Sequence, residues 1–464
     1  MKLLVQVVIS SMLTGIAWVG QAGAGENNEI SATAGELMRR AQQNNQAYDI
    51  VASLTTEVGP RLAGTESEAR ARKWAAKKLQ DLGFSNVRVE PFEVPLWVRG
   101  KEQAEIISPF PQALTISTLG GSVSTGPEGV QGEVQSFASL RELRAADADG
   151  VRGKIVFIDE VMARSKDGSG YAKAVAKRRE VAYLAEQFGA RAALIRSVGT
   201  SSHRFAHTGQ MRRVMDDGER GVPTAALTGP DADQLQRALS YGETVIIKLV
   251  LTPETRPAAM SGNVIAEIVG REAPEEIVLV GAHLDSWDLG TGAVDDGAGV
   301  GIVVAAAKAV LDLPESPRRT IRIVLFGSEE VGLVGGKAYT DKYADSLGKH
   351  IVATESDFGA ADIWRFDTRI DDSRLPLAEA VYSVFADLGV ERGNRQAYGG
   401  PDLKYLREAG VPVVSFVQDG SDYFDLHHTP NDTLDKIGRD DLSQNVAVYA
   451  AFLYFAAEVE RSFR

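Results

Sequence analysis

The sequence contains no cysteine among its 464 residues and only 6 histidines. Disulfide bonds and thiolate metal ligands are therefore excluded, so stability must come from buried apolar surface and from any metal bound through imidazole or carboxylate groups. A lipid anchor on an N-terminal cysteine is excluded as well. Free release from a membrane is the expectation for any exported form of this chain.

Long apolar runs are nearly absent, with one exception at the N-terminus. Lys2 is followed by the apolar run 3–19 and then by Ala22-Gly23-Ala24, which fits the small-x-small rule for signal cleavage. We predict a signal peptide over residues 1–24 and a secreted or periplasmic protein. The alternative is a membrane anchor, but the run is short for a span and is interrupted by Gly15.

Positive charge is in deficit, since 50 Lys and Arg face 63 Asp and Glu, for a formal net charge of −13. This balance argues against nucleic acid as a partner and, once a signal peptide is cleaved, against anionic membrane surfaces. The hydrophobic content of 44% is that of a soluble globular protein. The length predicts two domains, or one domain with a large insertion.

The character of the chain divides it into three parts. Residues 25–108 and 258–464 are predicted to form one catalytic domain, and residues 109–257 an inserted domain flanked by hinges that contain Pro109 and Pro257. The insert alternates strand-like runs and one helix, with glycines between them, and holds no convincing chemical cluster. Its predicted elements are strands at 130–134, 154–158, 192–195 and 245–251 and a helix at 171–188.

After residue 261 strand and helix patterns alternate strictly. Near-continuous apolar strands in such an order predict an α/β fold, a mostly parallel mixed sheet covered by helices on both faces. Strands are predicted at 264–269, 276–282, 320–326, 351–355 and 411–416, and helices at 296–311, 331–347, 375–388, 402–408 and 440–459. Before the insert, helices are expected at 36–54 and 66–82 and a strand at 87–94.

Ionisable residues gather where these predicted strands end. In open α/β sheets, sites form beyond the carboxyl ends of the strands, so side chains from these segments should meet at one edge. One such coincidence would mean little, but there are five. The segments are His283-Leu284-Asp285, Asp295-Asp296-Gly297, Glu329-Glu330, Glu355-Ser356-Asp357 and His427-His428.

Imidazole and carboxylate groups without thiolate favour zinc, and less exclusively manganese or cobalt. So many carboxylates in one crevice would repel one another unless cations neutralised them. Two divalent ions that share a bridging carboxylate and a water would satisfy this arrangement. A nearby carboxylate that binds no metal could then take a proton from the water.

These five segments, taken in order, resemble the co-catalytic zinc exopeptidases, and among them the aminopeptidase and glutamate carboxypeptidase relatives that carry a protease-associated insert. The likeness covers nearly the whole chain after residue 24, including the loop 59–65 and His207-Thr208-Gly209. It implies two Zn²⁺ ions per chain, peptide substrates and a homodimer.

The resemblance also implies roles that spacing alone does not give. Asp295 would bridge both metals, with a cis peptide bond to Asp296. His283 and Asp357 would complete one metal site, and Glu330 and His428 the other. Glu329 would be the general base, and His427 would stand where several relatives carry a tyrosine that stabilises the oxyanion. Asp285 would orient the imidazole of His283.

Candidates for contact with substrate are His207, Gly400 and Asp402. In the alternative interpretation His207 is a surface or interface residue and Asp402 caps a helix. Taken alone, His283 would be interpreted as a core histidine and Glu329-Glu330 as the start of a helix; the companion segments reverse that choice.

The sequence therefore predicts a secreted di-zinc metallopeptidase that cleaves dipeptides or short peptides near a free terminus. The alternatives are an aminopeptidase acting on longer peptides, a single-zinc acyltransferase of the glutaminyl cyclase type, and a non-catalytic, receptor-like homologue. The complete set of ligands argues against a non-catalytic homologue. The presence of ligands for two metal ions argues against the single-zinc enzyme.

Overall fold

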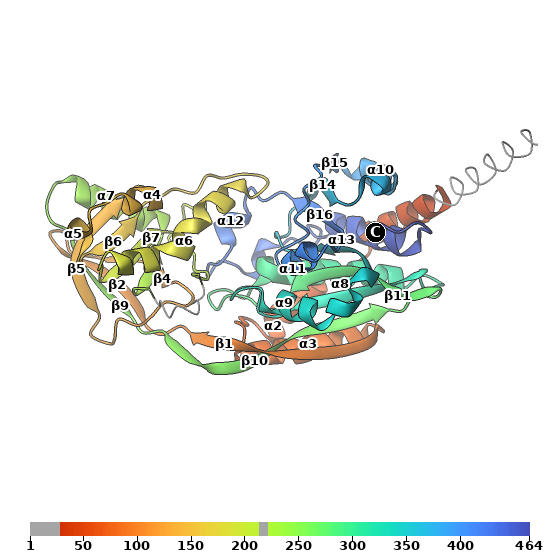
Figure 1. Ribbon diagram of the computed structural model, residues 1–464, viewed down its shortest axis with the longest axis horizontal. Coiled ribbons are helices and arrows are strands. Elements are labelled where there is room, and N and C mark those ends of the chain that lie inside the picture. Colours follow the sequence, from red (N-terminus) through yellow and green to blue (C-terminus); the bar gives the residue numbers. More distant parts are fainter. Residues whose placement is uncertain (1–27, 213–220) are drawn as a thin grey trace, which may run out of the picture.

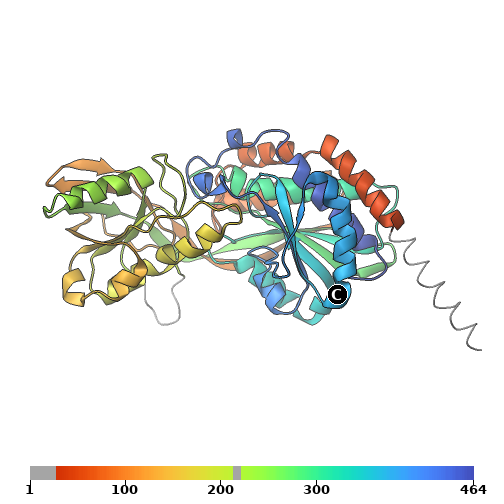
Figure 2. The same ribbon diagram turned by 90° about the horizontal axis from the view of Figure 1, so that it is seen from above.

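A computed structural model describes residues 28–212 and 221–464. Two lobes lie side by side along the longest axis, and each is built around an eight-stranded sheet (Figures 1 and 2). The predicted signal peptide, 1–24, lies outside the described residues. No helix of the described part is long and apolar enough to cross a membrane.

The first sheet has the strand order β1-β10-β12-β11-β13-β16-β14-β15. Its centre, from β12 to β16, is parallel, and antiparallel pairs flank it on both sides. The strands are β1 (Ser85–Val98), β10 (Glu254–Ile268), β11 (Ala273–His283), β12 (Arg319–Phe326), β13 (His350–Glu355), β14 (Ile363–Arg369), β15 (Glu391–Arg392) and β16 (Val413–Gln418).

Helices cover both faces of the first sheet (Figure 2). One face packs against α2 (Ala47–Glu57), α3 (Glu66–Asp81), α8 (Ala298–Leu311), α10 (Leu375–Phe385) and α13 (Ser443–Glu458). The other packs against α9 (Val334–Lys342) and α11 (Lys404–Glu408). The α8 sequence is apolar nearly all round, as expected for a helix buried between the sheet and neighbouring helices. The predicted α/β class is confirmed.

The second sheet has the order β3-β2-β9-β5-β6-β7-β8-β4. Its strands are β2 (Glu102–Ser108), β3 (Gln112–Leu114), β4 (Ile116–Thr118), β5 (Val130–Phe137), β6 (Ile155–Ile158), β7 (Ala192–Arg196), β8 (Thr224–Leu227) and β9 (Ile246–Leu251). On one face lie α4 (Leu140–Arg144), α5 (Ala148–Val151) and α6 (Ser169–Gln187), and on the other α7 (Gly229–Ser240). The sheet thus spans residues 102–251; its assignment to an inserted protease-associated domain at 109–257 stays a prediction.

The two lobes are joined by paired strands. β1 and β10 run antiparallel from the first sheet toward the second lobe (Figure 1), and Val98 still pairs with Glu254 at the far end. Pro257 therefore lies inside a strand, where its register shift forms a bulge, and not in the hinge that the sequence predicted. Paired backbone makes a stiffer connection than two free linkers would.

The predicted elements differ from the structure mainly in polar segments. The helix expected over 36–54 is broken: one helix ends at residue 43, and α2 begins at Ala47. The side chain of Asn45 accepts a hydrogen bond from the Ala47 N–H at 3.0 Å, which replaces a helical bond and starts the new helix. The elements that the sequence did not predict include strands β2, β3, β4, β8 and β14 and helices α4, α5 and α7.

A buried histidine in the first lobe makes stability depend on pH. Tyr339 accepts a hydrogen bond from Arg322 Nη1 at 3.0 Å, so its own hydroxyl proton points to Nε2 of His350, 2.8 Å away. His350 must therefore be neutral there. Burial, aided by the nearby charge of Arg322, lowers its pKa from 6.5 to about 4.

We predict that the burial of neutral His350 destabilises the folded protein in mild acid. Since the unfolded chain binds this proton near pH 6.5 and the folded chain only near pH 4, the contribution is complete above pH 6.5 and is lost as pH falls toward 4. Between pH 7 and 5 wild type should lose on the order of 1 kcal/mol more than His350→Gln. Thermal unfolding at both pH values measures this, with exposed His203→Gln as control; parallel losses in wild type and His350→Gln would contradict it.

Candidate metal centre

Five chain segments meet at one edge of the first sheet. His283 is the last residue of β11, and the Glu329-Glu330 and Asp357 segments follow β12 and β13. These strands are parallel neighbours, so their carboxyl ends lie together. Asp295 comes from the turn that leads into α8, and His428 follows the short helix α12 (Tyr423–Leu426).

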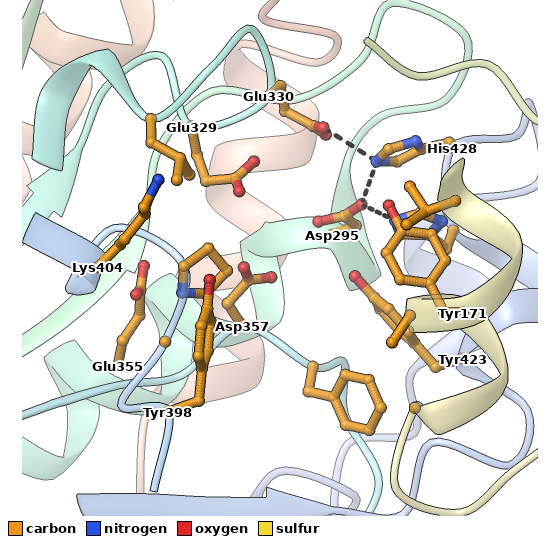
Figure 3. Close-up of a pocket in the computed structure, with 18 of the residues that line it drawn as sticks. Tyr171, Asp295, Glu329, Glu330, Glu355, Asp357, Tyr398, Lys404, Tyr423 and His428 are labelled. Atoms are coloured by element: carbon orange, nitrogen blue, oxygen red, sulfur yellow. Dashed lines mark ion pairs between the residues drawn. The ribbon is translucent and has the colours of Figure 1, made fainter. Parts of the chain in front are cut away.

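The carboxylate of Asp295 lies between the imidazoles of His283 and His428, and Figure 3 shows it beside His428. His283 Nε2 is 3.1 Å from Asp295 Oδ1 and 3.6 Å from Asp357 Oδ1. His428 Nε2 is 3.3 Å from Asp295 Oδ2 and 3.0 Å from Glu330 Oε2. The five residues proposed as ligands therefore form two sets that share Asp295.

The donor atoms fit metal ions. In each of three groups of three residues, the ligand atoms lie within 4.8 Å of one another, and their ring nitrogens and carboxylate oxygens suit zinc. The groups, which overlap the two sets without coinciding with them, are Asp295 with His427 and His428, His283 with Asp296 and Asp357, and His283 with Asp295 and Glu330. Oε1 of Glu330 is buried without a hydrogen-bond partner among the described residues. A metal ion would satisfy such an oxygen.

Further carboxyls crowd the same edge. Burial raises the pKa of each well above its ordinary value, and nearby carboxylates raise it further. The residues concerned are Asp296, Glu329, Glu355 and Asp402. Divalent cations between the two ligand sets would offset this excess of negative charge.

Asp285 holds the segment that carries Glu329 and Glu330. Its carboxylate accepts hydrogen bonds from the backbone N–H groups of Glu329 at 3.0 Å and Glu330 at 3.3 Å. The expected contact with His283 is made mainly by the backbone: Nδ1 of His283 is 3.0 Å from the carbonyl oxygen of Asp285 and 3.7 Å from its carboxylate. Asp285 thus links both ligand-bearing segments.

Asp296 shapes the turn before α8. The bond from Asp295 to Asp296 is a cis peptide. The Asp296 carboxylate accepts from the N–H of His283 and from that of Gly299, each at 3.0 Å. It thereby joins the end of β11 to the start of α8.

Two residues with no predicted role complete this support. Arg61 is fully buried and donates to the carbonyls of Leu284, Thr291 and Gly292, so it holds the loop between His283 and Asp295 from both ends. Asp432 accepts from the N–H groups of Val294 at 2.6 Å and Asp295 at 3.3 Å.

The only sequence signal for Arg61 was its place in the Gly- and Pro-rich loop 59–65. Asp432 follows closely on the last histidine pair, which was its only signal.

A cavity of about 860 Å³ opens over the ligands, between the two lobes. Its floor carries Asp295, Asp357 and the Glu329-Glu330 pair, and Gly400 lies on its wall. Helix α6 of the second lobe and its N-cap Gly168 form the opposite side, where the helix contributes Tyr171, Ala172, Val175, Arg178 and Arg179. Figure 3 shows Tyr171 and Tyr423 facing Asp295 across this space.

Two of the three predicted substrate contacts lie elsewhere. His207 is buried behind the cavity wall, with Nδ1 bonded to the carbonyl oxygen of His427. Asp402 is also fully buried, and its carboxylate accepts from the N–H of Gly336 in α9. Asp402 does not cap α11 either, whose N-cap is Leu403 without a side-chain bond.

His427 lies beside the proposed metal ligands. Its ring stacks on that of His428 with centroids 3.5 Å apart, and its Nε2 is 3.6 Å from Asp295 Oδ2. Burial lowers its pKa well below the ordinary value, so the ring is neutral. Tyr171, Tyr423 and Phe424 enclose it.

Comparison with known proteins identifies the family. A family model described as Peptidase family M28 matches residues 263–453. Carboxypeptidase Q of Homo sapiens is 35% identical over 418 residues, which cover 90% of this chain and 86% of that protein. The chain belongs to peptidase family M28. Membership confirms the predicted resemblance and makes the chain a metallopeptidase.

Solved structures agree with this M28 assignment. The crystal structure of a peptidase M28 precursor from Shewanella amazonensis is 49% identical, with a TM-score of 0.92, over 94% of this chain and 99% of that one. BSAP, a zinc aminopeptidase from Bacillus subtilis, is 22% identical, with a TM-score of 0.66, over 90% and 95% of the two chains. The latter likeness shows a shared fold.

We predict that Asp285→Asn impairs activity more than folding. The amide offers one acceptor oxygen to two backbone N–H groups, and its NH₂ would face the other donor, so the Glu329-Glu330 segment should shift. Peptidase kcat should fall roughly 10- to 100-fold, as for other groups that support a metal site. Steady-state kinetics measure this, with exposed Asp341→Asn as control. A kcat equal to wild type would show that the segment needs no such anchor.

Proposed function

We propose that this M28 peptidase binds two zinc ions and hydrolyses dipeptides or short peptides near a free terminus. The observation that supports this best is the carboxylate of Asp295, which lies between His283 and His428 at the floor of the cavity. One zinc would be held by His283, Asp295 and Asp357, and the other by Asp295, Glu330 and His428. Bound there, zinc would act as a Lewis acid on the peptide carbonyl and on the attacking water.

Glu329 is the proposed general base. It lines the cavity, follows β12 directly beside the ligand Glu330, and is held through its N–H by Asp285. It would take a proton from the water as the water oxygen attacks the carbonyl carbon. The same proton would pass to the amine as the C–N bond breaks, leaving a carboxylic acid and an amine.

His427 is the proposed donor to the oxyanion. Its neutral ring can donate one N–H, and it faces the same carboxylate, Asp295, that lies between the two ligand histidines. The surrounding aromatic rings keep the imidazole in one orientation. Gly400 on the opposite wall supports substrate contact through the backbone.

The second lobe favours short substrates. Helix α6 lies opposite the ligands, so the part of the peptide next to them lies in a cavity of about 860 Å³. An aminopeptidase acting on longer peptides would need the far end of this cavity to be open to the rest of the substrate peptide. The single-zinc acyltransferase and the receptor-like homologue are the remaining alternatives, and a measured metal content of one or zero would favour them.

Export and assembly belong to the same proposal. The pattern at 1–24 and the absence of cysteine support a secreted or periplasmic enzyme. Cell fractionation tests the first, and sedimentation tests the homodimer that the family resemblance implies.

We predict that Glu329→Gln retains zinc but loses turnover. Glutamine keeps the size and the backbone contact to Asp285 while it cannot accept the proton, so kcat should fall by on the order of 10³-fold with metal content unchanged. Metal analysis of dialysed protein and dipeptide hydrolysis measure this. Exposed Glu275→Gln serves as control, and near-normal turnover in Glu329→Gln would remove this residue from the base role.

We further predict that free dipeptides are cleaved with a higher kcat/KM than N-blocked dipeptides or peptides of six or more residues. The reason is the limited volume of the cavity beneath α6. Hydrolysis of a matched series by purified enzyme measures it. Faster cleavage of the longer, free-amine peptides would favour the aminopeptidase alternative.

A further inference from the structure

A short segment of the second lobe lies directly against the last histidine pair. The N–H of Thr208 donates to the carbonyl oxygen of His428 at 3.0 Å. The ring Nδ1 of His207 donates to the carbonyl oxygen of His427 at 2.7 Å. Residues 207–208 and 427–428 thus lie side by side, joined by one backbone and one ring hydrogen bond, although they come from different lobes.

The same segment contacts the imidazole of His428. Nε2 of this ring faces Glu330 and Asp295, as a metal ligand would, so Nδ1 has to carry the proton. Its acceptor is the carbonyl oxygen of Thr208, 3.2 Å away. Arg178 Nη1 lies 3.3 Å from the same Nδ1 and, as a donor only, bonds to the Thr208 carbonyl oxygen at 3.5 Å. The tautomer that leaves Nε2 free is therefore set by a backbone group of the second lobe.

Thr208 is itself firmly held through its side chain. Its Oγ1 donates to the carbonyl oxygen of Thr118 at 2.8 Å and accepts from Arg99 Nη2 at 3.0 Å. Arg99 in turn forms an ion pair with Asp288 at 2.8 Å, just beyond the His283 segment. A side chain at Gly209 is excluded, because a Cβ there would lie 2.7 Å from Nδ1 of His428.

His428 needs such support. Its φ of 62° is in the left-handed region that non-glycine residues rarely adopt, and such positions persist only where neighbours hold them. The bonds from Thr208 and from His207 are contacts of this kind. His207 is 2% exposed and packs beside Gly199, where a Cβ would overlap its ring.

We propose that His207 and Thr208 are positioning residues of the metal centre, which fix the orientation and tautomer of His428. The second lobe then has two tasks, since it covers the cavity and also completes the support of one metal ligand. This inference rests on the proposed zinc function. In this proposal His207 supports His428 and does not contact the substrate.

The test compares three variants of the full-length protein. His207→Leu removes the donor to the His427 carbonyl, whereas His207→Asn keeps one, because the amide nitrogen of asparagine can occupy the place of Nδ1. Leu235→Ala weakens the core of the second lobe far from the ligands. Zinc affinity is measured by competition with a chromogenic chelator, together with Tm and with kcat and KM for a dipeptide.

We expect one of the two zinc ions to bind about 10- to 100-fold more weakly in His207→Leu, which is the range for groups that orient a metal ligand. His207→Asn should recover most of this affinity. Leu235→Ala should lower Tm while both zinc affinities stay within about threefold of wild type. The cobalt-substituted enzyme should show an altered visible spectrum in His207→Leu only.

Wild-type zinc affinity in a folded His207→Leu would overturn the proposal, and so would an equal loss in Leu235→Ala. If His207→Leu does not fold, Thr208→Val replaces it, since that change removes the bond to Thr118 and keeps the side-chain shape; unchanged zinc affinity there overturns the proposal too. A wild type that binds no zinc would instead refute the proposed function, so the two failures are distinguishable.

Discussion

The carboxylate of Asp295, placed between the imidazoles of His283 and His428, is the constraint on which the rest of this site depends. A buried carboxylate is costly unless it is paired, and several more carboxyls surround this one. Peptide dipoles and two histidines cannot balance that charge alone. The arrangement is therefore one that a bound cation stabilises, and the M28 metallopeptidase family supplies the chemistry that uses it.

The chain holds this charged cluster mainly through its backbone. Arg61 donates to three carbonyls of the loop 284–292, while Asp285, Asp296 and Asp432 accept from N–H groups of the ligand segments. Such bonds leave the ligand side chains free and fix the loops that carry them. The carboxylate of Asp285 accepts from the N–H groups of Glu329 and Glu330, and its backbone carbonyl oxygen lies 3.0 Å from Nδ1 of His283. The two ligand sets therefore cannot shift independently.

The sequence predicts the meeting of the five segments because parallel strands end at one edge, a rule that needs only the order of strands and helices. It does not predict Arg61, whose partners are carbonyls remote in the chain and carry no side-chain pattern. Nor does it predict the place of His207, which depends on how one lobe sits on the other. The sequence also does not predict the break near Asn45. The helical spacing of apolar residues continues through this point and does not reveal a single hydrogen bond from the backbone to a side chain.

The register of the sheet explains why the second lobe reaches the site at all. Val264 of β10 pairs with Leu325 near the end of β12, so residues 254–263 continue past the edge where the ligands lie. β1 runs beside them, and the chain between the two strands must therefore leave and return on the ligand side. The chain segment between β1 and β10 therefore lies over the metal centre, close enough for Thr208 to bond to His428. The register depends on which residues of two distant strands pair with each other. It therefore cannot be predicted from the apolar pattern within either strand alone.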